Sequence, residues 1–454
     1  MDFPKPTDKK DAALENTQST PLRRPLAAGI DWAIFAVALF VVVCLPKSVS
    51  GDGRLRYEML ERFVETGRLL SPKYSTLGPL FSLPLYLLGR AFGAAKAVTS
   101  YYNAVLFLIA LGLIWREFRD ELSVALRRLL LLLLVCASMY AHHVQRYHSE
   151  VFTSVLVSAG VFWLSRGHGV RGWTAIVLGA VNNPASLLGV GAIAVCHARR
   201  TRRVWPLLGP VVAFAGIRLE SILVRGDLLN TGYNYDAGFH NALPYSGLPN
   251  FSYPFFFGIL SLLLSFGKGL VFFTPGMFFP LPASIPPRVR WIHRTLIAFV
   301  VGLLLVYAKW WSWYGGWFWG PRFFLIASIP ASFALASNLL AFRQFSVARR
   351  VLVALALVLS FWLGVNGLVF QGQGLELCAE NFYALEAYCH FVPEMSVLWH
   401  PFVDGAETIP RLWRTLGFIA VGFWTLAVGW VGRELFLDLL RRGTHYVLHW
   451  RDWW

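Results

Sequence analysis

The stretch from Ser48 to Gly89 has the densest mixture of acidic, basic and apolar residues in the chain. Asp52 lies just after the first apolar segment, between two glycines, and basic residues follow it. Apolar residues then recur every three or four positions, which predicts a helix lying on a membrane surface with one face buried. A carboxylate beside cations at such a surface could remove a proton near a bound anion. Asp52 could equally cap that helix, and the stretch alone leaves both interpretations open.

A second carboxylate, Glu150, begins a later apolar segment and is closely preceded by three histidines and an arginine. An acid at a helix start often interacts only with the helix dipole. At matching depth, however, Asp52 and Glu150 could share a general-base role or hold a divalent cation such as Mg²⁺, Mn²⁺ or Ca²⁺. The histidine spacing does not fit a zinc site well.

Two later cations lie in glycine-rich surroundings. Lys268, in LSFGKGL, suits either phosphate binding or anchoring at the membrane interface. Arg322 ends the run WSWYGGWFWGPR, whose glycines and proline predict an unusual turn beneath several aromatic rings. Aromatic faces bind sugar rings, and a guanidinium holds phosphate as a fork. An interfacial aromatic belt is the alternative, but a belt does not need this turn.

The elements that must position these residues are apolar segments. Of the 454 residues, 56% are hydrophobic and 15% are charged, against about 25% charged in an average soluble domain. We therefore expect an all-α integral membrane protein, a polytopic bundle of about twelve transmembrane helices with further helices and loops on its outer face. The net charge of +16 does not indicate nucleic-acid binding, because the basic residues gather in tails and short loops on one expected side, as in cytoplasmic loops.

The expected transmembrane segments are approximately 25–45, 97–115, 129–141, 150–166, 172–181, 185–198, 205–224, 269–285, 296–311, 323–340, 351–370 and 412–431. The segment 77–92 is apolar but broken by Pro79 and Pro84, which favours a re-entrant or surface helix. The expected organisation is a disordered cytoplasmic tail, a membrane domain and a cytoplasmic tail, over residues 1–25, 26–432 and 433–454. Three outer loops are expected, over residues 47–96, 225–268 and 371–411.

The five cysteines divide into two groups. Cys44, Cys136 and Cys196 lie in expected spans, where they would pack as small apolar residues. Cys378 and Cys389 share the third outer loop. A disulfide is possible there and would close the loop, but the sequence leaves it open whether one forms.

Four motifs, in this order and on one expected face, resemble the GT-C superfamily of membrane glycosyltransferases. The closest branch contains the protein O-mannosyltransferases and the lipid A aminoarabinose transferase. The motifs are Asp52 with the run from Tyr74 to Gly89, the acid Glu150, the run from Ser265 to Leu270, and the run from Gly315 to Arg322. The resemblance covers about residues 25–340.

This resemblance implies transfer of a sugar from a polyprenyl-phosphate donor to a lipid, glycan or protein acceptor, in a single inverting displacement. Asp52 would be the general base, with Glu150 as a second catalytic carboxylate. Cations aimed at the leaving phosphate would stabilise it; the candidates are Arg54, Arg56, Lys73, Lys268 and Arg322. The candidate sugar or acceptor contacts are Tyr57, Tyr74, His148, Trp317 and Trp319. The expected location is a bacterial inner membrane, with both termini cytoplasmic and the active site on the periplasmic face.

The chain departs from this family pattern at two positions. Asp52 is followed by Gly53, where relatives in the aminoarabinose branch usually have a second acid, so Glu150 gains importance. The turn Asn182-Asn183-Pro184 stands where those relatives often have Lys or Arg, which puts a phosphate contact from that turn in doubt.

Two other functions remain open from the sequence. A transporter or flippase of lipid-linked sugars would have broken spans and ionisable groups near the middle of the membrane, where Arg218 and Glu220 are the main candidates. A polymerase or ligase using lipid-diphosphate glycans would depend on outer-loop Arg and His more than on Asp52.

Overall fold

The structure is a computed structural model that describes residues 42–427 except 72, 235, 406 and 408, together with 29, 32, 33, 35, 36, 39, 40, 429 and 430. Within this part the chain is helical, with only isolated β-bridges at Ser48–Arg146 and Ala237–Pro249. The α-helices with described bounds are α3 (Asp52–Thr66), α4 (Leu77–Phe81), α5 (Leu83–Ala91), α6 (Ala95–Thr99), α7 (Tyr102–Glu117), α8 (Val124–Cys136), α9 (Tyr140–His143), α10 (Glu150–Ser165), α11 (Gly169–Asn182), α12 (Leu187–Thr201), α13 (Leu208–Arg225), α14 (Phe255–Leu264), α15 (Leu270–Phe273), α16 (Pro287–Tyr307), α17 (Ser328–Leu340), α18 (Val347–Val369), α19 (Glu380–Tyr383), α20 (Glu386–Phe391) and α21 (Pro401–Asp404). Residues 411–427 are helical as well. The expected tails over 1–25 and 433–454 lie outside the described residues.

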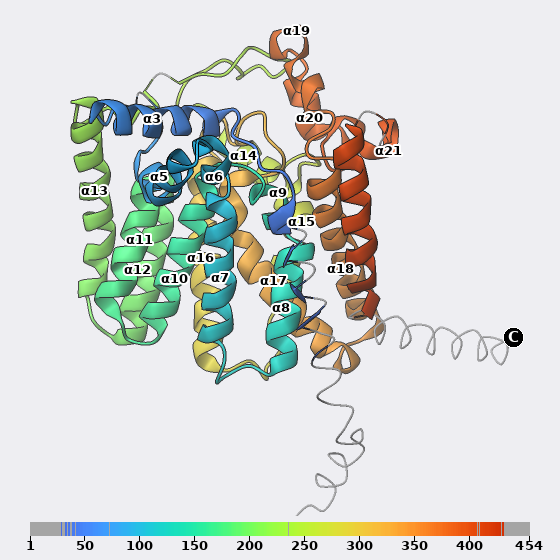
Figure 1. The fold of residues 1–454 in the computed structure, drawn as a ribbon. Helices are drawn as coiled ribbons and strands as arrows, with labels where there is room; N and C mark the ends of the chain where they lie inside the picture. The colour runs from blue at the N-terminus through green and yellow to red at the C-terminus, as the bar shows by residue number, and fades with distance from the viewer. Residues whose placement is uncertain are drawn as a thin grey trace, which may run out of the picture.

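Helix α3 lies across one end of the long helices, as the sequence predicts (Figure 1). It starts after Gly51 and ends at Gly67, whose left-handed backbone suits a residue without a side chain. Its buried face includes Tyr57 and Leu60. The short helices α4 and α5 follow at the same end, so the segment 77–92 forms no long helix.

Within the described residues, five helical segments are long and apolar enough to cross a membrane: Ala95–Glu117, Trp205–Arg225, Pro287–Tyr307, Arg322–Leu340 and Val347–Val369. The expected count of twelve is not confirmed. Several other expected spans are shorter helices, namely α8, α10, α11 and α12. Residues 269–285 were expected to form a span, but that expectation is wrong. They form only α15 and one short 3-10 turn, since four prolines between 275 and 286 interrupt the helix.

Glycines let the long helices approach closely. A side chain at Gly302 of α16 would meet the Cα of Gly189 in α12 at 2.4 Å, and one at Gly160 of α10 would meet the Gly172 carbonyl oxygen of α11 at 2.6 Å. Small residues at such crossings are typical of helix packing in membranes, where dispersion contacts replace the hydrophobic drive.

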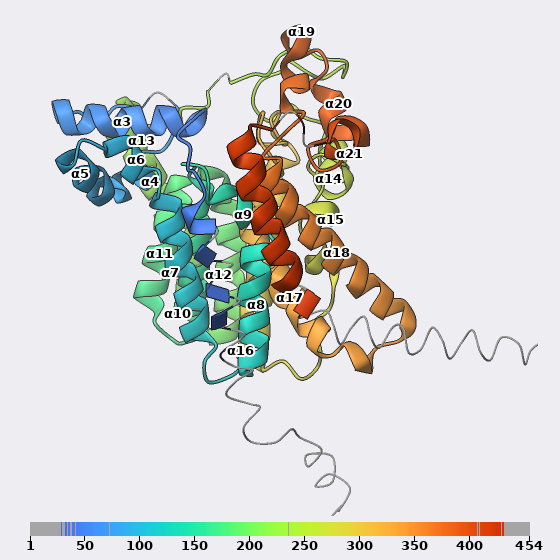
Figure 2. The same ribbon diagram turned by 45° about the vertical axis from the view of Figure 1, so that its right-hand side comes forward.

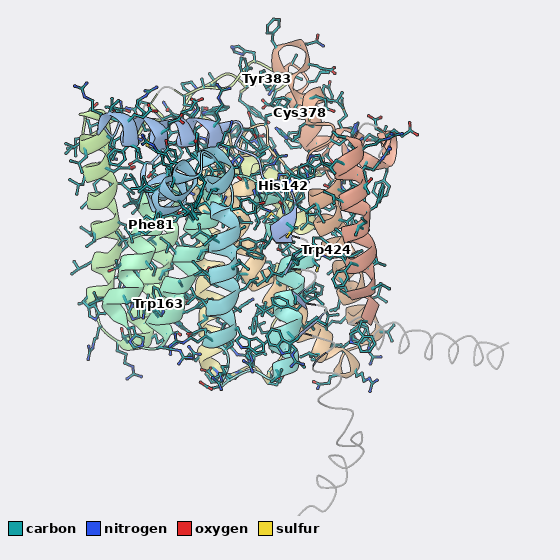
Figure 3. The ribbon with its side chains drawn as sticks, viewed as in Figure 1. Phe81, His142, Trp163, Cys378, Tyr383 and Trp424 are labelled. Carbon is teal, nitrogen blue, oxygen red and sulfur yellow. A yellow bond between two sulfur atoms is a disulfide. The ribbon has the colours of Figure 1, made fainter. Side chains whose placement is uncertain are left out.

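The third outer loop gathers α19, α20 and α21 at the same end as α3, on the other side of the molecule (Figure 2). Cys378 and Cys389 form a disulfide there, with 5.8 Å between their Cα atoms. Cys378 and Tyr383 lie together at this end, whereas Trp163 lies at the opposite end (Figure 3).

The opposite end contains a group of ion pairs, which we call the Arg288 cluster: Arg288, Glu117, Glu121 and Arg166. The Arg288 guanidinium bonds the carboxylates of both Glu117 and Glu121. Arg166 bonds the second oxygen of Glu117 at 3.0 Å. This cluster joins the ends of α7, α10 and α16.

Candidate active site

A cavity of about 800 Å³ opens between α3, the ends of α10 to α13, the end of α16, and the two later outer loops. We call it the outer cavity. Of the residues expected to act in catalysis or binding, seven line it: Asp52, Arg56, Lys73, Tyr74, Glu150, Trp317 and Arg322. Segments widely separated in the sequence therefore meet at one place.

Asp52 and Glu150 are brought together by a backbone contact between their two segments. Ser48 pairs with the segment before Glu150, since its N–H donates to the Gln145 carbonyl (2.9 Å) and its carbonyl accepts from Tyr147 N–H (3.1 Å). Gly53 allows α3 to approach, because a side chain there would lie 2.3 Å from the Tyr147 carbonyl oxygen. Glycine at this position is a condition for the pairing of the two carboxylates.

Arg322 bridges the two carboxylates, and these three residues form what we call the Arg322 cluster. Its guanidinium lies 2.8 Å from Asp52 Oδ2 and 3.5 Å from Glu150 Oε1. The Tyr74 hydroxyl donates to Asp52 Oδ1 at 2.7 Å. Glu150 Oε2 is buried and has no hydrogen-bond partner among the described residues. An unsatisfied buried carboxylate oxygen is costly, so Glu150 is poised to accept a hydrogen bond from a ligand or water.

The charge state of Asp52 follows from its surroundings. Burial alone would raise its pKa, but the Arg322 guanidinium and the Tyr74 hydroxyl outweigh burial and lower the pKa to about 2. Asp52 is therefore ionised at neutral pH. Burial, with Arg322 nearby, lowers the pKa of His148 well below its usual range, so His148 is neutral.

Arg322 is held by the glycine-rich turn that the sequence predicts. Gly315, Gly316 and Gly320 all have positive φ, which favours glycine. The Arg322 Nε donates to the Gly315 carbonyl at 2.6 Å, and the guanidinium lies 3.9 Å from the centre of the Phe318 ring. This turn fixes the guanidinium before any ligand arrives.

Lys268 supports this turn and does not line the outer cavity. Its ammonium donates to the carbonyls of Gly316, Phe318 and Gly320. The side chain is 2% exposed, and its donors are occupied by the backbone. Lys268 therefore holds the turn, and its ammonium does not point into the outer cavity as the phosphate contact expected from the sequence would require.

Four further expected site residues also lie away from the outer cavity lining. Arg54 is exposed and pairs with Glu58 at 2.6 Å. Tyr57 packs in a small apolar cluster beneath α3. Trp319 is buried, donates to Asn366 at 2.7 Å and stacks on a histidine. His148 is buried with its ring against Phe318. Tyr57, His148 and Trp319 are thus used in core packing, whereas Arg54 is used in a surface ion pair.

Several cavity residues were not singled out as site residues from the sequence. Glu220 accepts hydrogen bonds from Ser75 Oγ (2.8 Å) and Thr76 N–H (2.7 Å). Arg225 donates to the Tyr74 carbonyl at 3.1 Å. Both belong to α13 and hold the segment that carries Tyr74. In the sequence, Glu220 stands out with Arg218 as a charge in an otherwise apolar segment, which suggests a position near the middle of the membrane; Arg225, the last residue of α13, has no such signal.

Asp236 and Glu386 also line the cavity. Asp236 pairs with Lys73 at 2.9 Å. Glu386 accepts from the Tyr314 hydroxyl at 2.9 Å, and burial raises its pKa to about 6. Both acids come from the later outer loops, which no local pattern connects to Asp52.

The possible divalent cation has no matching ligand set as the side chains stand. Among the described residues there is no group of three or more His, Cys, Asp or Glu placed to hold a metal ion. The positive charge between Asp52 and Glu150 is supplied by Arg322.

The fold and cavity define a helical protein with apolar helices long enough to span a membrane and a polar site at one end. No protein-family model matches the chain, and no curated protein matches its sequence. The structure is similar to two crystal structures of ArnT from Cupriavidus metallidurans, one bound to undecaprenyl phosphate and one in the apo state. The TM-score is 0.47 for both, with 14% and 15% identity, over 90% of this chain and 77% and 78% of ArnT. At this identity and TM-score the similarity is reported as one of overall helical arrangement, and no residue role carries over.

Proposed function

We propose that this protein is a membrane glycosyltransferase that moves a sugar from a polyprenyl-phosphate donor to an acceptor hydroxyl outside the cytoplasm. The observation that carries the proposal is the outer cavity in which Arg322 joins Asp52 and Glu150. One part of the cavity is polar, as a phosphate and a sugar require. Another part is lined by apolar residues from α12, α13 and α16, suited to a lipid chain: Leu187, Leu188, Pro210 and Val306.

The proposed reaction is one displacement. The acceptor oxygen attacks the anomeric carbon, the bond from that carbon to the phosphate oxygen breaks, and polyprenyl phosphate leaves with the bonding electrons. The acceptor proton passes to Asp52. Arg322, with Arg56 and Lys73 in the same lining, would neutralise the leaving phosphate. Trp317 offers a partly exposed ring for the sugar face.

The ion pair with Arg322 keeps Asp52 weakly basic until the donor binds. A carboxylate with a pKa near 2 is a weak base, and general bases work best with a pKa closer to the working pH. A donor phosphate bound by Arg322 would share the guanidinium and weaken its hold on Asp52. We therefore expect the basicity of Asp52 to rise in the donor complex.

The sidedness rests on two features. A disulfide forms in oxidising compartments, and Cys378 and Cys389 lie at the cavity end of the molecule. Arginines gather at the opposite end, as in cytoplasmic loops. Both features support a cavity that faces away from the cytoplasm.

One observation favours the transporter alternative, namely the interrupted stretch at residues 269–285. Broken helices often form substrate sites in transporters. The carboxylates and cations of this protein, however, gather at the end of the helices, and the polar atoms beside this stretch belong to the Lys268 support of the Arg322 turn. Chemistry at the outer cavity accounts for more of the structure.

The test is transfer of radiolabelled sugar from a panel of polyprenyl-phosphate sugars to lipid and protein acceptors in membranes. Asp52→Asn keeps the shape of the side chain but loses its basicity, so we expect transfer to fall by about 10²–10⁴-fold. Arg54→Gln is the matched control, because Arg54 is on the same helix but exposed and outside the cavity. Protein amount is equalised by immunoblot.

Unchanged transfer in Asp52→Asn would show that Asp52 is not the base. If wild-type protein transfers sugar from no monophosphate donor, the glycosyltransferase proposal fails in this form. Movement of intact labelled lipid across vesicles by the wild type would then favour the transporter, whereas product from diphosphate donors alone would favour a ligase.

A further inference from the structure

A second hollow, of about 320 Å³, lies at the end of the helices opposite the outer cavity. We call it the inner pocket. Its lining comes from the end of α7 with the turn after it, the end of α10, and the start of α11, and it includes Arg116, Glu117, Arg119, Trp163, Arg166 and Arg171. Trp163 marks its place at the end away from Cys378 and Tyr383 (Figure 3).

The inner pocket has an excess of positive charge. Four arginines line it against two carboxylates. One of these carboxylates, Glu117, is already compensated, since one oxygen bonds Arg288 and the other bonds Arg166 at 3.0 Å. Within the described part of the chain, the side chains of Arg116, Arg119 and Arg171 form no hydrogen bond or ion pair. An anion entering the pocket would find three guanidinium groups whose N–H donors have no partner among the described residues, although the Arg171 guanidinium lies over the Trp163 ring.

Helix-end electrostatics explain only some of these arginines. Arg116 and Arg166 lie at the C-terminal ends of α7 and α10, where a cation offsets the partial negative charge of the helix end. Arg171 lies in the first turn of α11, where a cation is electrostatically unfavourable. Helix α11 also has no side-chain cap. The start of α11 therefore adds to the positive potential, and a bound anion would relieve the unfavourable position of Arg171.

The pocket lies at the level where a membrane ends. Arg116 is next to the last residue of the apolar segment Ala95–Glu117. The Trp163 ring packs 4.2 Å from the Arg171 guanidinium, and tryptophan prefers the membrane interface. Basic pockets between transmembrane helices at this depth suit phosphate groups of lipids.

From these contacts we propose that the inner pocket is a binding site for a phosphate-bearing anion, held by Arg116, Arg119 and Arg171. The anion is either the phosphodiester of an anionic phospholipid or free phosphate, since both present the same acceptor oxygens to a guanidinium fork. This site is separate from the outer cavity and does not depend on the proposed transfer reaction.

The experiment titrates the purified full-length protein in detergent with three probes: a short-chain phosphatidylglycerol, a short-chain phosphatidylcholine and inorganic phosphate. Binding is followed by native mass spectrometry and by the shift in unfolding temperature. Arg119→Gln with Arg171→Gln should weaken anion binding by about tenfold or more, because two charged hydrogen-bonding groups are lost. Arg199→Gln with Arg203→Gln is the matched control, since both are exposed arginines at the same end outside the pocket lining.

Saturable phosphatidylglycerol binding that the pocket variant alone weakens supports a lipid headgroup. Equal sensitivity of inorganic phosphate binding supports recognition of the phosphate group itself. The proposal is overturned if neither anion binds saturably to wild type, if phosphatidylcholine binds equally well, or if the control variant weakens binding as much as the pocket variant does. Because unfolding temperatures without ligand are measured for both variants, a loss of folding is distinguished from a loss of binding.

Discussion

The two ends of the molecule contain the same chemical arrangement in different surroundings. In the Arg322 cluster, one guanidinium bridges Asp52 and Glu150. In the Arg288 cluster, one guanidinium bridges Glu117 and Glu121. Each arginine is largely buried and fixes the ends of helices that are distant in the sequence. A guanidinium between two carboxylates is therefore not by itself a sign of an active site.

The difference lies in what remains unsatisfied. Both oxygens of Glu117 are paired, since Arg166 bonds the oxygen that Arg288 does not. Arg288 itself does not line the inner pocket. Glu150 has an unpaired oxygen, and all three residues of the Arg322 cluster line the outer cavity. The saturated cluster stabilises the fold, whereas the unsaturated one has capacity left for a ligand.

The largest expected effect is on stability, at the Arg288 cluster. Arg288→Met removes the cation shared by the buried Glu117, which keeps Arg166, and the half-buried Glu121, so the free energy of unfolding should fall by up to about 3 kcal/mol. Transfer activity per folded molecule should change by less than about twofold, because Arg288 is remote from the outer cavity. Thermal unfolding in detergent and the transfer assay measure the two quantities. Arg290→Met is the control, since the partners of Arg290 among the described residues are backbone carbonyls. An equal loss of stability in both variants would contradict the comparison.

Arg322→Lys should have the opposite profile. A lysine keeps the charge but cannot bridge two carboxylates and a phosphate as a planar fork, so transfer should fall by about 10²–10³-fold. The unfolding temperature should fall less than it does in Arg288→Met. If Arg322→Lys unfolds as readily as Arg288→Met while retaining activity, both clusters are structural and the distinction between them is wrong.

Acid should weaken the Arg322 cluster in a defined range. The pKa of Asp52 is about 2 in the folded protein, below its value of about 3.9 in an unfolded chain. The stabilisation, about 2 kcal/mol, is present above the unfolded value and is lost as the pH falls through the folded one. The unfolding temperature of the wild type should drop between about pH 4 and pH 2 more steeply than that of Asp52→Asn. Parallel curves for the two proteins would contradict the ion pair.

The smallest expected effect comes from removing one charge at each cluster. Glu150→Gln leaves Arg322 with Asp52 alone and should lower transfer by about tenfold, with little change in unfolding temperature. Glu121→Gln in the other cluster should change the unfolding temperature but not transfer. If Glu150→Gln changed the unfolding temperature and Glu121→Gln changed transfer, an unpaired carboxylate oxygen would not distinguish the functional cluster from the structural one.

The sequence predicted the parts of the site that depend on local pattern. The spacing after Asp52 predicts α3 and its position on the surface, and the glycines before Arg322 predict the turn. The motif order places Asp52, Glu150 and Arg322 on one face, and the structure brings them into contact. The roles of these residues in binding and catalysis remain predictions, because the structure establishes only their geometry.

The rest depended on tertiary contacts that no window of sequence contains. Lys268 has the type and setting of a phosphate ligand, yet a loop about fifty residues later in the chain supplies its three carbonyl partners. Trp319 belongs to the same aromatic run as Trp317, but only Trp317 lines the outer cavity. The segment 269–285 has the hydropathy of a span, but its prolines prevent a continuous helix.

The support of the Arg322 turn by Lys268 has a consequence for how fast a donor can be captured. A loop that must become ordered around its ligand draws on the free energy of binding and slows capture. Here the turn is already ordered around an internal ammonium, and its Trp317 indole N–H donates to the carbonyl of Leu375, three residues before the disulfide-bonded Cys378. Donor binding then requires only an exchange of partners on a stationary guanidinium. We expect the arrival of the lipid carrier through the membrane, and not loop closure, to set the rate of capture.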